Sequence, residues 1–119
     1  MLSCYCADEL VTRGSQAALR SAVSRAYYSA FCQARDRLYS KADRGATMPD
    51  RETHGSHERV WRAYRGRNGT LNARIGSIGF RLMNQRRKAD YEAEYIPTAD
   101  EVRSLLQSAR QLIDLLPRV

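Results

Sequence analysis

Apolar residues recur every three or four positions between residues 19 and 38 of this chain. The set is Leu19, Ala22, Val23, Ala26, Tyr27, Ala30, Phe31, Ala34 and Leu38. This spacing returns to one face of an α-helix, which has 3.6 residues per turn. Gly14 suits the end of a preceding helix, and Ser15 suits the N-cap of the next. The pattern therefore predicts a long helix from about Ser15 to Lys41, whose alanines allow a neighbouring helix to approach closely.

Two further segments in the middle of the chain have the same periodicity. The segment at about 53–64 places His57, Val60, Trp61 and Tyr64 on one face. The segment from about 71 to 87, or slightly beyond, has a stripe of Leu71, Ile75, Ile78 and Leu82, with Thr70 as the expected cap. Gly76 and Gly79 weaken that helix by about 1 kcal/mol each relative to alanine. We expect these glycines to pack against the alanine row of the long helix.

The C-terminal helix has the clearest start signal. Thr98 and Glu101 form a capping box after Pro97, and apolar spacing continues to about Leu116. A short helix is predicted over residues 2–12, and a polar loop over 42–52. No segment alternates as a strand would. The chain is therefore predicted to be all-α, a single domain over residues 1–119 built as a four- to five-helix up-and-down bundle.

Composition restricts the cellular context. The 119 residues contain no apolar run near the roughly 18 needed to cross a bilayer. The N-terminus lacks the basic start and long apolar run of a signal peptide. With three cysteines and no export signal, we expect free thiols in a cytoplasmic protein that does not bind membranes. The chain has no phosphate-binding glycine loop, and we expect no cofactor.

Charge is distributed unevenly along the chain. The net charge is +7, and 18 of the 20 basic residues are arginine. Nine basic residues and no acidic ones lie between Arg59 and Lys88, so the middle of the protein could meet phosphates. The candidate binding residues there are Arg59, Arg62, Arg81, Arg87 and Lys88, together with Tyr28 and His54. Two plainer interpretations are GC-rich coding DNA, which favours arginine everywhere, and an ordinary solvated helix face.

The segment from Asn84 to Tyr91 is the second unusual feature. Its three consecutive cations, Arg86, Arg87 and Lys88, stand near the end of a helix, where the dipole favours them. Asp90 follows Arg86 by four residues and could form an ion pair with it. Tyr91 could anchor the helix end against the core. A purely structural role is thus one interpretation of this segment.

The two segments together resemble motifs of the HEPN family, the small helical domains named for higher-eukaryote and prokaryote nucleotide binding. The matching segments are Ser24–Phe31, with the letters SRAYYSAF, and Arg86–Tyr91, with the pattern RxxADY; residues 54–61 resemble the histidine-containing segment between them. The resemblance implies a helical bundle that forms a homodimer. It also implies either an RNase of a toxin–antitoxin, CRISPR or other defence system, or an inactive binding module. Its ligand would be RNA, a nucleotide or a partner protein such as a nucleotidyltransferase or defence-complex subunit.

The chain departs from the RNase pattern of that family at one position. Active members have an arginine, then four to six residues, and then a histidine. Arg86 matches the arginine, but Tyr91 stands five residues after it and no histidine follows. A tyrosine, with a usual pKa near 10, is a poor base at pH 7. The first hypothesis is therefore a dimeric binding module with a degenerate RNase motif. The alternative is a metal-independent endoribonuclease that uses Arg86, Arg87, Asp90 and Tyr91, with His54 or His57 assisting.

The sequence predicts different environments for the two histidines. His57 lies on the predicted inner face beside Trp61, where a hydrogen-bonded core residue is the simpler interpretation. His54 is expected at an exposed helix start. A zinc site made by these histidines with Cys4 and Cys6 is not favoured, because a second cysteine pair is missing. Folding is expected to bring Arg25 and Tyr28 towards Arg86, Asp90 and Tyr91.

Overall fold

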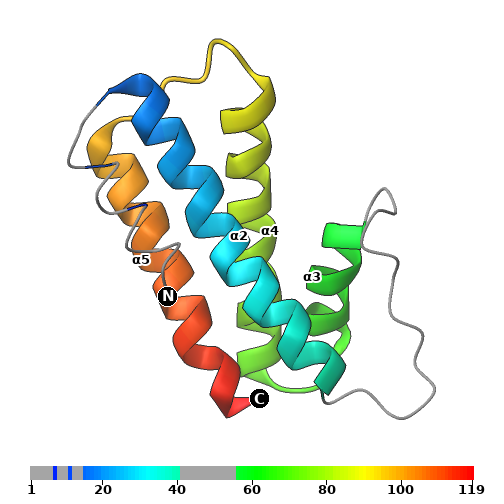
Figure 1. The fold of residues 1–119 in the computed structure, drawn as a ribbon. Coiled ribbons are helices and arrows are strands. Elements are labelled where there is room, and N and C mark those ends of the chain that lie inside the picture. The colour runs from blue at the N-terminus through cyan, green and yellow to red at the C-terminus, as the bar shows by residue number, and fades with distance from the viewer. Residues whose placement is uncertain (1–6, 8–10, 12–14, 41–55) are drawn as a thin grey trace.

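The computed structural model describes residues 7, 11, 15–40 and 56–119. Four α-helices and a short C-terminal 3-10 helix occur in this part of the chain, and no strand occurs in it (Figure 1). The predicted all-α helical bundle is thereby confirmed. Ala7 and Val11, within the predicted helix 2–12, are helical and buried. The rest of that helix, the predicted loop 42–52, Cys4, Cys6 and His54 lie outside the described residues.

Helix α2 (Gln16–Ser40) is the long helix expected from the apolar repeat. Ser15 caps it, because its Oγ accepts a hydrogen bond from the backbone N–H of Ala18 at 3.1 Å. Every member of the predicted apolar stripe is buried, from Leu19 to Leu38. The periodicity of the sequence thus identified both the helix and its inner face.

Helices α3 (Ser56–Gly66) and α4 (Thr70–Tyr91) are joined by a tight turn. The expected cap was wrong by one position. Thr70 is the first residue of α4, and the N-cap is Gly69, whose φ of 111° lies in the left-handed region that favours glycine. Helix α4 also continues to Tyr91, well past residue 87, so that the whole RxxADY segment belongs to one helix.

Helix α5 (Ala99–Leu115) is followed by the 3-10 helix η1 (Leu116–Arg118). The predicted start is confirmed: Thr98 Oγ1 accepts a hydrogen bond from the backbone N–H of Glu101 at 3.1 Å. The apolar face of this helix is buried, except Leu105, which is half-buried against the core; its buried members are Val102, Leu106, Ala109, Leu112, Ile113 and Leu116.

Helix α4 runs antiparallel to all three other helices, while α2 and α5 run in the same direction (Figure 1). Side-chain bonds at the helix ends fix this arrangement. Arg20, at the start of α2, donates to the carbonyl of Ala89 in the last turn of α4 at 3.2 Å and to that of Glu92, the C-cap of α4, at 2.8 Å. Arg37, near the end of α2, donates to the Val119 carbonyl at 2.8 Å, beyond the end of α5. Helix α3 packs mainly on α4.

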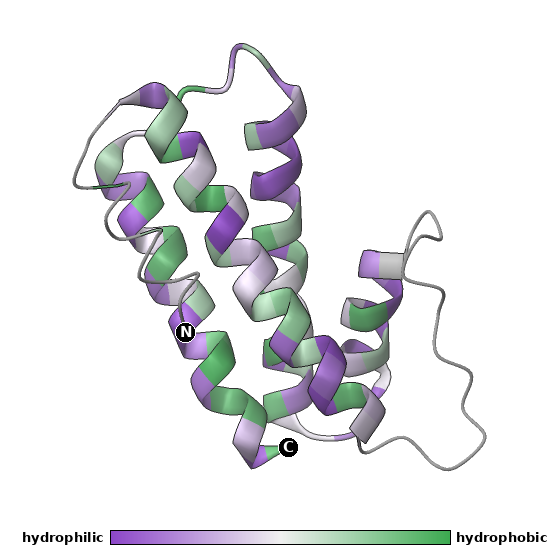
Figure 2. Ribbon diagram, in the orientation of Figure 1, coloured by the Kyte–Doolittle hydropathy of each residue, from purple (hydrophilic) through white to green (hydrophobic). Residues whose placement is uncertain are grey.

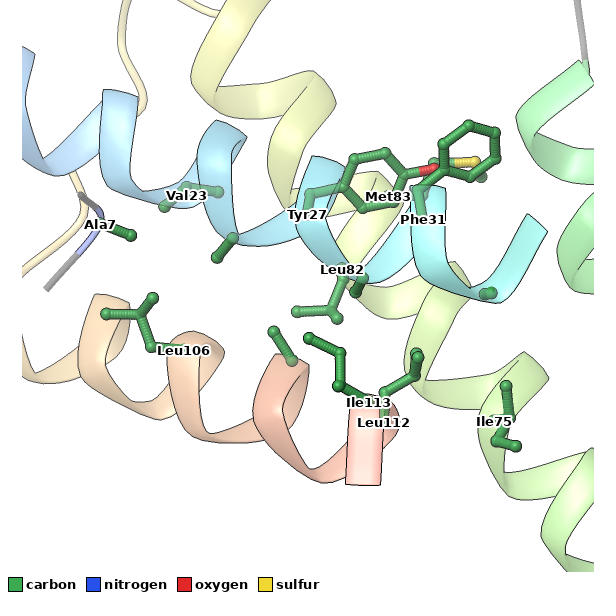
Figure 3. Close-up of a cluster of buried hydrophobic side chains, with 14 of the residues drawn as sticks. Ala7, Val23, Tyr27, Phe31, Ile75, Leu82, Met83, Leu106, Leu112 and Ile113 are labelled. Carbon is green, nitrogen blue, oxygen red and sulfur yellow. The ribbon is translucent and has the colours of Figure 1, made fainter. Parts of the chain in front are cut away.

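The core lies between the amphipathic faces of these helices. Figure 2 shows bands of hydrophobic and hydrophilic residues alternating along each helix. In the close-up of Figure 3, Val23 of α2, Leu82 of α4 and Leu106 of α5 point into the same interior. Trp61 and Tyr27 are the two largest fully buried side chains. Aromatic residues of α2 and α3 therefore fill the region where these helices meet α4.

The two glycines of α4 pack against α3 rather than α2, which corrects the expectation from the sequence. A Cβ added at Gly79 would lie 2.1 Å from Cε3 of Trp61, and one added at Gly76 would lie 2.3 Å from Cγ of Arg65. Neither position has room for a side chain. The sequence could not predict which helix lies against these glycines, because it shows which residues are small but not which helix approaches them.

Candidate functional site

Arg86 is the centre of a cluster that joins α4 to α2. Its guanidinium carbon lies 5.3 Å from the ring centroids of both Tyr27 and Tyr28, within the range of cation–π attraction. One of its nitrogens donates to Asp90 Oδ2 at 3.2 Å, and the same nitrogen lies 3.5 Å from the Tyr28 hydroxyl. Only 8% of Arg86 is exposed. The arginine is thus held by groups of its own protein.

Asp90 completes this cluster from the next turn of α4. The i, i+4 spacing puts its carboxylate beside Arg86. The other carboxylate oxygen accepts a hydrogen bond from the hydroxyl of Ser24 on α2. Asp90 therefore pairs with the cation and also ties α4 to α2. The predicted Arg86–Asp90 ion pair is confirmed, and Ser24 is its unpredicted third member.

Tyr27 links Arg86 to the histidine of α3. Its hydroxyl accepts a hydrogen bond from Trp61 Nε1 at 3.1 Å and lies 2.8 Å from His57 Nδ1. The indole N–H of Trp61 donates to the Tyr27 hydroxyl oxygen, and the hydroxyl shares with His57 Nδ1 a hydrogen bond whose direction depends on the imidazole tautomer. His57 also stacks on Phe31, with ring centroids 3.9 Å apart.

The surroundings of His57 keep its ring uncharged. Burial, and to a smaller extent the positive charges of Arg86, Arg87 and Arg35, together lower the pKa of His57 to about 4. Burial also raises the pKa of Tyr27 above its usual value. The hydrogen bond expected for His57 is present, but the ring is half-buried at the edge of the core instead of inside it. Folding has also brought His57 close to Arg86, through their shared neighbour Tyr27.

This arrangement constrains the chemistry that the cluster can perform. An efficient general base at neutral pH has a pKa near 7, and His57 lies well below that value. Arg86 would stabilise a phosphate best if its guanidinium were available, yet it already pairs with Asp90. Its Nε is buried without a hydrogen-bond partner, and faces aromatic rings. In this conformation the cluster is suited to holding α2, α3 and α4 together.

Arg87 connects α3 and α4 beside the cluster. Two of its nitrogens lie 3.4 Å from Glu58 Oε1, and the second oxygen of Glu58 lies 3.6 Å from Arg62 on the next turn of α3. Glu58 thus neutralises part of the charge of two predicted binding residues. This ion pair could not be predicted from local spacing, because 29 positions separate Glu58 and Arg87.

Cations cover the opposite side of α4. The outer face of α4 is defined here as the stripe of exposed residues Arg74, Ser77, Arg81, Asn84, Lys88 and Tyr91. These residues recur at intervals of three and four, and the stripe is about 25 Å long at 1.5 Å per residue. Arg81 donates to the Ser108 hydroxyl of α5 while remaining exposed. Hydrophilic residues colour the upper turns of α4 in Figure 2. Arg81 and Lys88 are predicted binding residues and Arg74 is not, although its seven-residue spacing from Arg81 indicates the same helix face.

The remaining predicted residues lie on the surface. Tyr91 does not anchor the helix end, because 78% of it is exposed. Arg25 is exposed on α2. Arg59 is exposed on α3, and its charge acts on Tyr39 of α2. The residues expected around Arg86 that the structure shows in contact with it are Tyr28 and Asp90.

Comparisons with family models, curated proteins and solved structures found no match to this chain. Among the residues that the structure describes, no helix is long and apolar enough to cross a membrane. The same residues contain no group of three or more His, Cys, Asp or Glu that could hold a metal ion.

Proposed function

We propose that this chain is a HEPN-like module that binds RNA through the outer face of α4 and does not cleave it with the Arg86 cluster. The observation that supports this most is the row of Arg74, Arg81 and Lys88, seven residues apart and exposed on one helix face. No acidic residue occurs between Arg59 and Lys88. Such a row is complementary to a phosphate backbone, and arginine can contact phosphates with two nitrogens at once.

The state of the Arg86 cluster favours binding over cleavage. The arginine that matches the RNase motif of the HEPN family is 8% exposed and paired with Asp90. The nearby histidine is uncharged at neutral pH because of its burial and the arginine charges around it. As part of the same proposal, the protein is a homodimer of a prokaryotic toxin–antitoxin or defence-type system, with a cognate protein such as a nucleotidyltransferase.

RNA binding is tested by fluorescence anisotropy with a labelled RNA at low and moderate salt. We expect binding that weakens as salt rises, because phosphate contacts release counterions. The double variant Arg74→Glu/Arg81→Glu should weaken binding at least tenfold. The control Arg103→Glu changes one exposed arginine of α5, which pairs with Asp100, and should have little effect. Absence of RNA binding by the unchanged protein at low salt would contradict the proposal.

The alternative, a metal-independent endoribonuclease, is favoured by one observation: His57 and Arg86 share the neighbour Tyr27. Incubation of total RNA with the protein in the presence of a chelator separates the two functions. Binding without cleavage supports the module. Cleavage that disappears in Arg86→Ala, in protein that circular dichroism shows to be folded, would support the endoribonuclease. Cleavage that persists in Arg86→Ala would exclude Arg86 as its basis.

The dimer is tested separately by light scattering. A homodimer has twice the 13.6 kDa mass of the chain. A stable species of 13.6 kDa at micromolar concentration would contradict the dimer but would leave RNA binding by one chain intact.

A further inference from the structure

Tyr91 is the most exposed large hydrophobic side chain among the described residues, at 78%, against 43% for Tyr28 and 61% for Ile96. It is the last residue of α4. A tyrosine ring carries a large apolar surface, and such rings usually gain stability by being covered. Tyr91 gains little stability of this kind, because its ring is exposed instead of packed against the end of the helix. Its ring is therefore available to a binding partner.

Helical spacing places cations next to this ring. Lys88 precedes Tyr91 by three residues and Arg87 precedes it by four, and residues at these separations are neighbours on a helix surface. Asn84, one turn further back, adds an amide that can both donate and accept hydrogen bonds. Asp90, the acid nearest to Tyr91 within the helix, faces the other way, towards Ser24 and Arg86. The exposed acids Glu92 and Glu94 follow beyond the helix end. Tyr91 thus ends the stripe of positive charge on α4, and its cationic neighbours lie on the helix side of the ring.

We propose that Tyr91 is a base-stacking platform, and that the RNA bound on the outer face of α4 is single-stranded. The inference rests on the proposed RNA-binding function and specifies its ligand. Proteins that bind single strands combine cations that follow the phosphate backbone with aromatic rings on which bases stack. In a duplex each base is covered by its neighbours, so an exposed tyrosine on a helix surface cannot reach a base face. An unpaired base presents that face to Tyr91 while its phosphates contact Lys88 and Arg81.

The experiment compares a labelled single strand of about ten nucleotides, within the site sizes known for such proteins, with the same strand annealed to its complement. Tyr91→Ala should weaken binding of the single strand roughly 5- to 140-fold and leave duplex binding almost unchanged. Tyr91→Phe should retain the affinity, because it keeps the ring. Lys88→Gln should weaken binding of both forms and reduce the salt slope for the single strand by about 0.7.

Several results would overturn the inference while the proposed function stands. One is equal or tighter binding of the duplex. Another is an unchanged affinity of Tyr91→Ala for the single strand when Lys88→Gln weakens it. Conversion of a dimer to a monomer by Tyr91→Ala, seen by light scattering, would make Tyr91 an interface residue instead. Competition by poly-glutamate as strong as by RNA would indicate an acidic protein partner. If neither strand form binds the unchanged protein, the proposed function itself fails.

Discussion

Helix α4 places arginines in two opposite environments. On its inner face, Arg86 is buried between two tyrosine rings and paired with Asp90. On its outer face, Arg74 and Arg81 are exposed on a stripe without acids. The same type of residue therefore takes part in packing on the inner face of α4 and is open to an anionic ligand on the outer face. What separates the two roles is the set of neighbours that the other helices supply.

The inner face should respond most strongly to added volume at Gly79. The variant Gly79→Ala places a Cβ 2.1 Å from the fully buried ring of Trp61, so α3 or the ring must move. We expect a loss of about 2 to 3 kcal/mol in the free energy of unfolding, even though alanine favours the helix. Urea denaturation measures it. Gly66→Ala is the matched control, because nothing lies within 4 Å of its Cβ, and equal losses in the two variants would contradict the close approach of α3.

Removal of the buried cation should have the next largest effect. Arg86→Ala leaves Asp90, whose side chain is 31% exposed, without its partner, and removes the attraction to both rings. We expect a loss of about 2 kcal/mol in the free energy of unfolding. Arg74→Ala is the outer-face control and should change stability by less than about 0.5 kcal/mol, because Arg74 is exposed. A loss in Arg74→Ala as large as that in Arg86→Ala would remove the distinction between the two faces.

Low pH should lower the free energy of unfolding through the protonation of His57, which packs near the inner face of α4. Its pKa falls from a usual 6.5 to about 4 on folding, so between these pH values the unfolded chain binds more protons than the native protein. Stability therefore rises with pH across this window and is lost as pH falls from about 6.5 towards 4. With allowance for the partial exposure of His57, the loss is about 1 to 2 kcal/mol.

Denaturation at pH 4.5 and pH 7 measures this loss. The variant His57→Asn keeps an acceptor for the Tyr27 hydroxyl but does not titrate, and should show a smaller difference between the two pH values. Carboxylates that also titrate in this range are common to both proteins and cancel in the comparison. An identical pH dependence in the two proteins would mean that His57 is not held uncharged by its surroundings.

The outer face should show the smallest change in stability. Replacement of Arg74, Arg81 and Lys88 together by glutamine removes three exposed charges and should alter the free energy of unfolding by no more than about 0.5 kcal/mol. Thermal and urea denaturation test this. The same variant should lose most of its salt-dependent RNA affinity. A large loss of stability would show that the stripe supports the fold rather than a ligand.

Local spacing in the sequence predicted much of the fold and one contact of the site. The repeat from Leu19 to Leu38 identified the inner face of α2, because a face depends only on residues per turn. Thr98 identified the start of α5 for the same local reason. The Arg86–Asp90 pair followed from its i, i+4 separation. Each of these features lies within one helix or at its end.

Only the tertiary structure decided which helix meets which face. It placed Trp61 of α3 against Gly79, where the sequence suggested α2, and it joined His57 to Tyr27 across 30 positions. It also left Tyr91 exposed instead of anchored. The physical reason is common to all three: helical periodicity fixes the direction of a side chain around its own axis, whereas its partners depend on how neighbouring helices cross. For α4, the sequence determined two faces, and the packing of α2 and α3 determined which arginine became structural.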